Sequence, residues 1–207
     1  MKKSDIALLI SLIIIITTIV LLNCFASKTQ RLLMKYAKNQ VNFTINIIID
    51  NTIRSILSEE QFNNIIEIEK NDDKEITNIN FNNNKINKIL SLSTNNILNE
   101  INKNNSRKYE IPFGVISNNH FFHNLGPTVP YQISILGQLN NNTYINIKEY
   151  GINNSKIEIL LNIELEYQIM LAFAKETQKI NKEIILESKI IQGNIPTYYG
   201  NVNSLLK

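Results

Sequence analysis

The sequence predicts an α+β protein that is anchored by an N-terminal transmembrane helix. A long apolar run lies near the N-terminus, apolar residues then recur at three- and four-residue spacing in two later stretches, and alternating apolar and polar residues fill much of the second half. The continuous apolar run is typical of a membrane span. The three- and four-residue spacing is typical of amphipathic helices, and the alternation is typical of half-buried strands. The 207 residues have room for one ordinary domain plus an appendage.

Residues 6–25 form the predicted transmembrane helix. At ~1.5 Å per residue, this run crosses a hydrocarbon core of ~30 Å. Up to Leu22 its polar members all carry hydroxyl groups that can bond carbonyls of the same helix: Ser11, Thr17 and Thr18. Residues 1–5, with Lys2 and Lys3, form the predicted cytoplasmic N-terminus, although four basic residues follow the run on its other side.

Two alternatives remain open for this segment. The run could be a cleaved signal peptide, although it is longer than a typical apolar core and no small-x-small site closes it. Cys24 could carry a lipid, although Asn23 stands where a small residue would be expected. An unmodified cysteine at the membrane boundary is the simpler interpretation.

Residues 28–58 form a predicted amphipathic helix, with Ser27 as its cap. Its stripe consists of Leu33, Ala37, Val41, Ile45, Ile48, Ile49, Thr52, Ile53 and Ile56. The stripe either docks on the chain's own domain or forms a coiled-coil dimer. Because its spacing is not strictly heptad, the sequence favours docking within the chain.

Residues 62–105 form a predicted hairpin followed by a helix. The segments 65–69 and 76–81 alternate or nearly alternate, and they flank the turn-forming residues 71–74. The helical period then returns at Ile86, Leu90, Ser93, Ile97 and Ile101, after an asparagine cluster that can cap a helix. Because a two-stranded hairpin cannot bury its apolar face alone, we expect the two helices to cover it.

Residues 109–200 form a predicted antiparallel β region, and residues 201–207 form a C-terminal tail. The expected strands are 110–115, 131–139, 144–150, 156–172 and 179–191. The longest alternates cleanly between apolar and charged residues, with one break around Leu160. Gly126 and Gly193 are expected in turns that need unusual backbone angles, and residues 118–125 are expected to form a short helical turn.

The composition argues against several classes of site. With 21 basic and 18 acidic residues, the net charge of +3 is too balanced to favour a nucleic-acid partner. A single cysteine excludes an internal disulfide framework and a multi-thiolate metal site. His120 and His123 could share one helical face, but no third ligand is identifiable, so no metal site is predicted.

No catalytic or cofactor-binding residue is predicted either. The carboxylate pairs Glu67/Glu69 and Glu164/Glu166 sit at alternate strand positions, which is typical of a solvated sheet surface. The sequence contains no Gly-x-Ser-x-Gly elbow and no phosphate-binding glycine loop. We therefore expect a protein that is not an enzyme and that makes protein contacts, although a catalytic set drawn from distant positions would leave no local pattern.

Four ordered motifs make the chain resemble the YunB family of sporulation proteins from endospore-forming Firmicutes. They are Ile111-Pro112-Phe113-Gly114, Leu125-Gly126-Pro127, Gly151-Ile152-Asn153-Asn154, and the closing segment 190–199 with Gly193, Pro196, Tyr198 and Tyr199. Each motif is weak alone. Their order and spacing, together with the N-terminal membrane helix, cover nearly the whole chain.

The resemblance implies a role in endospore formation, with production in the mother cell and placement in a membrane around the developing spore. It implies no reaction. The leading hypothesis is a non-enzymatic membrane protein whose extracytoplasmic domain joins protein partners or copies of itself in the sporulation envelope. The alternatives are an envelope enzyme acting on peptidoglycan or cortex precursors, and a lipoprotein or small-ligand carrier acylated at Cys24.

Overall fold

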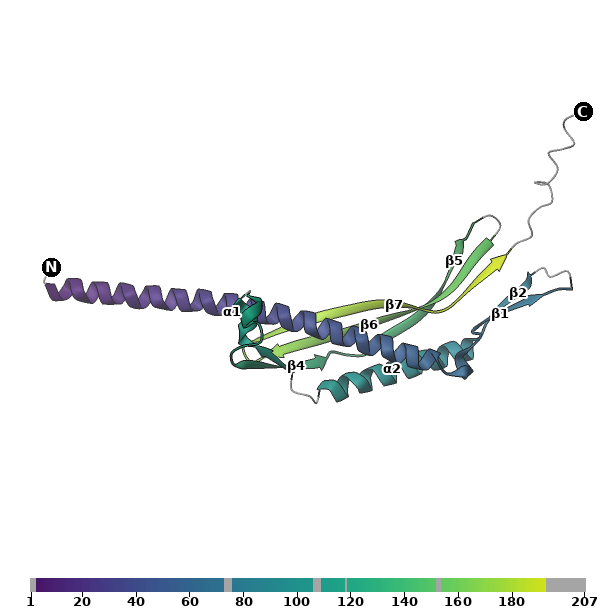
Figure 1. Cartoon of the computed structure of the whole chain (residues 1–207), viewed down its shortest axis with the longest axis horizontal. Helices are drawn as coiled ribbons and strands as arrows, with labels where there is room; N and C mark the ends of the chain where they lie inside the picture. Colours follow the sequence, from purple (N-terminus) through teal and green to yellow (C-terminus); the bar gives the residue numbers. More distant parts are fainter. Residues whose placement is uncertain (1–2, 73–75, 106–108, 118, 152–153, 193–207) are drawn as a thin grey trace, which may run out of the picture. The chain divides into compact units, whose positions relative to one another are not determined.

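The computed structural model describes residues 3–72, 76–105, 109–117, 119–151 and 154–192. Its class is α+β, as the sequence predicts (Figure 1). Several predicted features lie outside the described residues: residues 1–2, the middle of the hairpin turn, much of the Gly151–Asn154 motif, the turn at Gly193 and the tail 201–207.

The chain divides into two compact units, each made of three separate stretches. Unit 1 comprises residues 1–47, 101–136 and 166–178, and unit 2 comprises residues 48–100, 137–165 and 179–207. Four elements contribute residues to both units: the helices α1 (Lys3–Leu57) and α2 (Asn83–Asn105) and the strands β6 (Asn154–Leu171) and β7 (Ala174–Gln192).

Helix α1 is continuous, where the sequence predicted separate helices over 6–25 and 28–58. The expected cap, Ser27, lies inside the helix, and its Oγ donates to the carbonyl oxygen of Asn23 at 2.9 Å. That prediction was wrong because a serine hydroxyl can bond a carbonyl one turn back as well as cap a helix. The hydroxyls expected to bond within the apolar run do so: Thr17 to Ile13 and Ile14, and Thr18 to Ile14.

The N-terminal part of α1 is long and apolar enough to span a membrane. Residues 11–28 are all exposed, and Figure 1 shows this part of the helix, in purple, extending past the strands of unit 1. The core helix of a soluble protein would bury its apolar side chains. Exposed apolar residues over this length are typical of a segment surrounded by lipid.

The rest of α1 docks on the chain itself, which confirms the favoured interpretation of its apolar stripe. The buried members of the stripe are Leu33, Ala37, Val41 and Ile45 in unit 1, and Ile49, Thr52, Ile53 and Ile56 in unit 2, and Met34 is buried beside them. Most are four residues apart. Since a helix turns ~100° per residue, such a stripe drifts by ~40° per step, which does not suit the straight seam of a heptad coiled coil.

The sheet of unit 1 is built from β3 (Tyr109–Pro112), β4 (Thr128–Ile135) and the adjoining ends of β6 and β7. Strand β4 pairs antiparallel with β3 and with β6. One face is buried: Ile111, Tyr131, Ile133, Tyr167, Ile169 and Leu171. The hydroxyl of Tyr167 donates to the Asn42 side chain on α1, so the buried face is the one that α1 covers.

Strand β3 ends at Pro112, before the predicted end at Val115. The chain turns there into two 3-10 helices, Phe113–Ser117 and His120–Phe122, the second inside the predicted helical turn. The amides of Phe113 and Gly114 donate to the carbonyls of Pro127 and Leu125 at 2.9 and 2.8 Å. These bonds close residues 113–126 into a loop, which we call the FG loop.

Unit 2 contains the hairpin of β1 (Ile66–Lys70) and β2 (Ile76–Phe81), helix α2 (Asn83–Asn105, up to residue 100), β5 (Asn140–Glu149) and the remaining parts of β6 and β7. The predicted cap of α2 is confirmed, because the Lys85 amide donates to Asn82 Oδ1 at 3.1 Å. The helices were predicted to bury the apolar face of the hairpin, and this face is buried only at its base. Ile66 is buried there, whereas Ile68 and Ile79 are half-buried.

Strand β5 begins earlier than predicted, because residues 140–142 continue the ladder with β6 instead of turning. Asn141 Nδ2 donates to the Leu90 carbonyl at 2.7 Å and to Thr94 Oγ1 at 2.9 Å, which fastens β5 to α2. The break in sequence alternation at Leu160 does not interrupt the strand. The register runs evenly through Leu160, which simply faces away from the buried side.

Candidate functional site

Both histidines of the sequence lie in the FG loop. The ring of His123 packs edge-on against Tyr36, with 5.7 Å between ring centroids. His120 begins the second 3-10 helix of the FG loop. Across the described ranges, no three His, Cys, Asp or Glu side chains gather closely enough to hold a metal ion.

The predicted surface carboxylates take part in polar contacts along the strands. Glu164 pairs with Lys179 at 2.8 Å, and the hydrogen bond from that lysine lowers the pKa of the Glu164 carboxyl. Glu166 is exposed. On the hairpin, Glu69 accepts a hydrogen bond from Asn80 at 2.9 Å. A lowered pKa keeps Glu164 ionised at neutral pH, which is the opposite of what a general acid needs.

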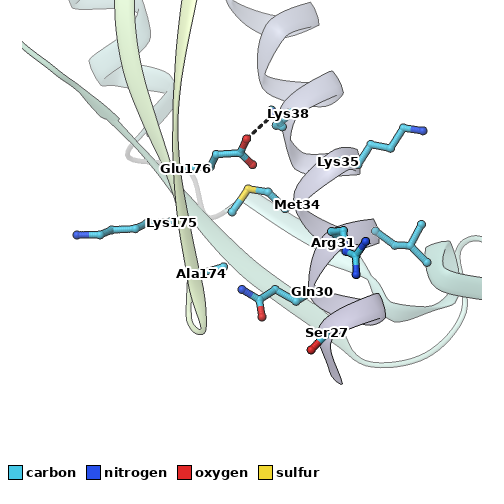
Figure 2. A pocket seen from close by; sticks show the side chains of 10 residues that line it. Ser27, Gln30, Arg31, Met34, Lys35, Lys38, Ala174, Lys175 and Glu176 are labelled. Carbon is cyan, nitrogen blue, oxygen red and sulfur yellow. Dashed lines mark hydrogen bonds and ion pairs between the residues drawn. The ribbon is translucent and has the colours of Figure 1, made fainter. Parts of the chain in front are cut away.

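The most distinctive polar feature of unit 1 is a basic pocket between α1 and the start of β7, which we call the juxtamembrane pocket (Figure 2). It has a volume of about 650 Å³ and follows directly after the apolar run of α1. The residues that line it are Ser27, Gln30, Arg31, Leu32, Met34, Lys35 and Lys38 of α1, and Ala174, Lys175 and Glu176 of β7.

Two contacts hold the walls of this pocket together. Lys38 Nζ lies 2.6 Å from Glu176 Oε1, as the dashed line in Figure 2 marks. Nearer the apolar run, Gln30 Nε2 donates to the carbonyl oxygen of Phe173 at 3.5 Å. The β6–β7 turn is therefore tied to α1 at two levels.

The lining of the juxtamembrane pocket has a strong positive bias. Arg31, Lys35, Lys38 and Lys175 line this pocket together with a single acidic residue, Glu176, which pairs with Lys38. Figure 2 shows the side chains of Lys35 and Lys175 extending away from each other. Among the residues that the structure describes, none forms an ion pair with Arg31, Lys35 or Lys175 within 4.0 Å. Such a cluster can attract phosphate or carboxylate anions, and its lining includes no paired nucleophile and base.

Sequence reasoning missed this pocket. From the sequence, Lys28, Arg31, Lys35 and Lys38 are predicted to be basic residues beyond the span, with Lys35 and Lys38 on the polar face of the amphipathic helix. Their spacing of three and four residues could have shown that they share one side of a helix. The contribution of Lys175 had no local signal, because it depends on the β6–β7 hairpin folding back beside α1.

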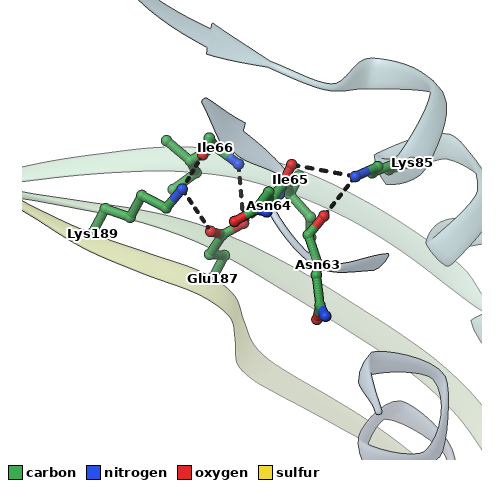
Figure 3. Close-up of polar contacts among 7 residues, drawn as sticks. All are labelled: Asn63, Asn64, Ile65, Ile66, Lys85, Glu187 and Lys189. Carbon is green, nitrogen blue, oxygen red and sulfur yellow. Dashed lines mark hydrogen bonds and ion pairs between the residues drawn. The ribbon is translucent and has the colours of Figure 1, made fainter. Parts of the chain in front are cut away.

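Unit 2 contains a second polar cluster, centred on Glu187 of β7 (Figure 3). Its Oε2 accepts hydrogen bonds from the amides of Ile65 and Ile66 at 2.5 and 3.0 Å. Lys189 pairs with Glu187 at 3.3 Å and also donates to the Ile66 carbonyl. Because a charged acceptor satisfies backbone amides at the entrance to β1, the cluster is a structural clamp.

The same segment is fixed from a second side. Lys85 Nζ donates to the carbonyl oxygens of Asn63 and Asn64, at 2.5 and 3.4 Å, as Figure 3 shows. Asn64 has a positive φ of 55°, a conformation that asparagine tolerates better than most residues. The chain entering the hairpin is thus held in one conformation.

Two buried tyrosines of unit 1 are also structural. Burial raises the pKa of Tyr131 and of Tyr167 to about 12. Tyr131 stacks on Tyr109 with 5.1 Å between ring centroids, and Tyr167 donates to Asn42. A raised pKa makes a tyrosine harder to ionise, so neither is poised to act as a base or nucleophile at neutral pH.

Comparison with known proteins supports the resemblance seen in the sequence. Residues 108–198 match the model of the family described as Sporulation protein YunB. The chain is also 23% identical to "Sporulation protein YunB" of Bacillus subtilis (strain 168), over 90% of this chain and 78% of that protein. No solved structure matches. The resemblance of this chain to the YunB family of sporulation proteins, predicted from its ordered motifs, is therefore confirmed.

Proposed function

We propose that this protein is a membrane-anchored assembly component needed for endospore formation, with no catalytic activity of its own. It is made in the mother cell and resides in that cell's membrane or in the outer forespore membrane. The role in endospore formation is supported by the resemblance to the YunB family. The observation that carries the membrane anchoring is α1, a single helix whose first part is exposed and apolar and whose later part belongs to the folded core.

A continuous helix supports an anchoring role because it leaves no flexible linker between span and domain. The backbone hydrogen bonds of α1 run through residues 25–33, where the exposed apolar run gives way to buried positions such as Thr29 and Leu33. Unit 1 is therefore held at a fixed height above the membrane. A rigid mount suits a protein that presents surfaces to partners beside a membrane.

The sheet edges offer a surface for such partners. Among the described strands, β5 ends the order of its sheet and pairs only with β6. Its exposed side chains include Tyr144, Ile145 and Ile147. An edge with unpaired backbone groups and apolar side chains can add a strand from another chain, which supports protein partners or self-association.

The proposed orientation places the N-terminus in the cytoplasm and both units outside it. Lys2 and Lys3 support this orientation, because the first charges of a chain usually dominate its insertion. The basic residues after the span oppose it. A reporter that is active only outside the cytoplasm, fused after residue 207, should be active, and activity of a cytoplasmic reporter there would reverse the orientation.

The function is tested by deleting the gene in an endospore-forming host and counting heat-resistant spores, while a fluorescent fusion is followed in sporulating cells. We expect a large loss of spores, unchanged vegetative growth and signal around the forespore. Normal spore numbers in the deletion strain, with no second family member to compensate, would contradict the proposal. Signal spread through the cytoplasm would contradict the membrane assignment.

A further inference from the structure

The end of unit 1 next to the apolar run exposes several large apolar side chains. Phe121, Phe122 and Leu125 of the FG loop are 88%, 53% and 57% exposed, and Phe173 of the β6–β7 turn is 49% exposed. Two elements far apart in sequence thus present aromatic residues near one end of the unit. In water this exposure is costly, because each such side chain would gain from burial.

The FG loop contacts α1 where the apolar run ends. An open apolar pocket of about 530 Å³ is lined by Phe25, Lys28 and Thr29 of α1 and by FG-loop residues that include Phe122 and Leu125. The neighbouring residue His123 packs instead on Tyr36. Tyr36 lies ~16 Å beyond Phe25 along the helix axis, on the side away from the apolar run. Phe122 therefore points toward the membrane side of the loop, and His123 points away from it.

The height of this contact matches the headgroup layer of a bilayer. If residues 6–25 cross the ~30 Å hydrocarbon core, the headgroup layer of ~5–8 Å covers roughly the next five residues of an upright helix. Lys28 and Thr29, which line the apolar pocket, fall within those five residues. Gln30, which holds the Phe173 carbonyl, does so too. The FG loop and the β6–β7 turn therefore lie at the lipid surface.

The charges around this end fit the same surroundings. Lys28 lines the apolar pocket, and Arg31, Lys35 and Lys175 line the juxtamembrane pocket just above it. Aromatic side chains at the headgroup level with basic residues directly above them are typical of segments that lie on anionic membranes. The exposed apolar residues of the FG loop adjoin Phe25, at the end of the apolar run, so that the two apolar surfaces are continuous. This continuity favours the lipid that surrounds the span over a separate protein partner.

We propose that the FG loop and the β6–β7 turn form a second membrane-binding site, which inserts Phe121, Phe122, Leu125 and Phe173 into the interface of the bilayer that holds the anchor. Lys28, Arg31 and Lys175 bind the phosphates of anionic lipids at this site. The inference rests on the membrane anchoring proposed above. Its consequence is that unit 1 is held against the membrane at several points, which fixes its orientation as well as its height.

Depth measurements on the full chain in lipid nanodiscs test this site. The chain has one cysteine, Cys24, which can carry a nitroxide spin label directly. In a Cys24→Ser background, Phe121→Cys and Phe173→Cys carry the label at the proposed site. Phe43→Cys is the matched control, because Phe43 is 63% exposed on the same helix but lies ~27 Å beyond Phe25.

We expect the labels at 121 and 173 to collide with oxygen dissolved in lipid more than with a water-soluble nickel complex, and the label at 43 to show the reverse. A membrane-embedded label at Cys24 with aqueous labels at 121 and 173 would overturn the second site while leaving the anchor intact. An aqueous label at Cys24 would overturn both. These outcomes separate the two claims.

The charge component is tested by lipid selectivity around a label at Cys24. Spin-labelled anionic and zwitterionic lipids are compared as quenchers of a fluorophore at this position, in the full chain and in Lys28→Gln/Arg31→Gln/Lys175→Gln. Since each basic residue at a surface contributes about fivefold to anionic-lipid binding, the preference should fall at least fivefold. Arg54→Gln, an exposed change in unit 2, should leave it unaltered, and an unchanged preference in the triple variant would contradict phosphate binding.

Discussion

The FG loop depends on the absence of a side chain at Gly114. A Cβ atom placed there would lie 1.7 Å from the Phe122 carbonyl oxygen and 2.6 Å from that of Leu125, whereas ordinary contacts begin at about 3.4 Å. Both neighbours are backbone atoms, so no side-chain rotation relieves the clash. Gly114→Ala must therefore push the two sides of the loop apart by more than 1 Å, a shift on the scale of packing disruption.

The cost can be built from two contributions. Separating the loop breaks the 2.8 Å hydrogen bond from the Gly114 amide to Leu125, which is worth ~1 kcal/mol net. Overpacking adds ~1–3 kcal/mol. The free energy of local opening of the loop should therefore fall by ~2–4 kcal/mol, which corresponds to an acceleration of amide exchange by about 30- to 900-fold.

The assay is hydrogen exchange at the Phe113 amide, which donates to Pro127 across the same loop. Gly137→Ala is the matched control, since Gly137 has a positive φ of 74° but no atom within 4 Å of the added Cβ. It should cost only ~1–2 kcal/mol of backbone strain and leave Phe113 unaffected. Unchanged exchange at Phe113 in Gly114→Ala would refute the close approach as the reason for this glycine.

Two further predictions concern unit 2. Glu187→Ala should speed amide exchange at Ile65 and Ile66 by roughly tenfold or more, because hydrogen bonds to a charged acceptor are worth ~1.5–3 kcal/mol each. Unchanged exchange at both amides would contradict the role of Glu187 as a structural clamp. The hydrogen bond from Lys156 at 2.6 Å lowers the pKa of Glu158 below its usual 4.5. Its stabilising effect is therefore present above pH 4.5 and is lost as the pH falls below that value. In unfolding measurements between pH 7 and pH 3, Glu158→Gln should lose less stability than the natural chain, and equal losses would contradict this role.

Helices and strands that show a regular spacing of apolar residues along the sequence were predicted well. The alternation from Ile157 to Tyr167 required a half-buried strand, and the structure buries every second residue of it through Leu171. The apolar spacing of α2 likewise predicted a helix, although Ile89, not Leu90, is buried. In these segments the spacing of side chains alone decides which face is buried, so no distant contact is needed to find the element.

The ends of helices and strands were predicted poorly where a side chain can make either of two hydrogen bonds. Ser27 could cap a helix or donate to the carbonyl oxygen of Asn23, and the local sequence does not distinguish these two hydrogen bonds. Asn141 favours turns by its local chemistry, but its bonds to Leu90 and Thr94 keep it in a strand. The outcome at Asn141 depends on residues some 50 positions away, which a local pattern does not reveal.

The same limit applies to the candidate site. Its α1 half was visible in the sequence as basic residues directly after an apolar run. Its other half, Lys175 and Phe173, and the FG-loop aromatics gain meaning only when the chain folds beside the end of the span. The sequence predicted the membrane helix and the resemblance to the YunB family, and the fold was needed to show which surfaces lie next to that helix.

The most direct test of the account is the number of heat-resistant spores formed when the deletion strain expresses the chain without residues 2–25. Replacing Ile6–Phe25 with an unrelated apolar helix of equal length serves as the control for anchoring itself. The account predicts spore numbers at the level of the deletion strain for the truncated chain, and substantial recovery with the replaced helix. Full complementation by the truncated chain in the cytoplasm would contradict the claim that this protein acts from a membrane.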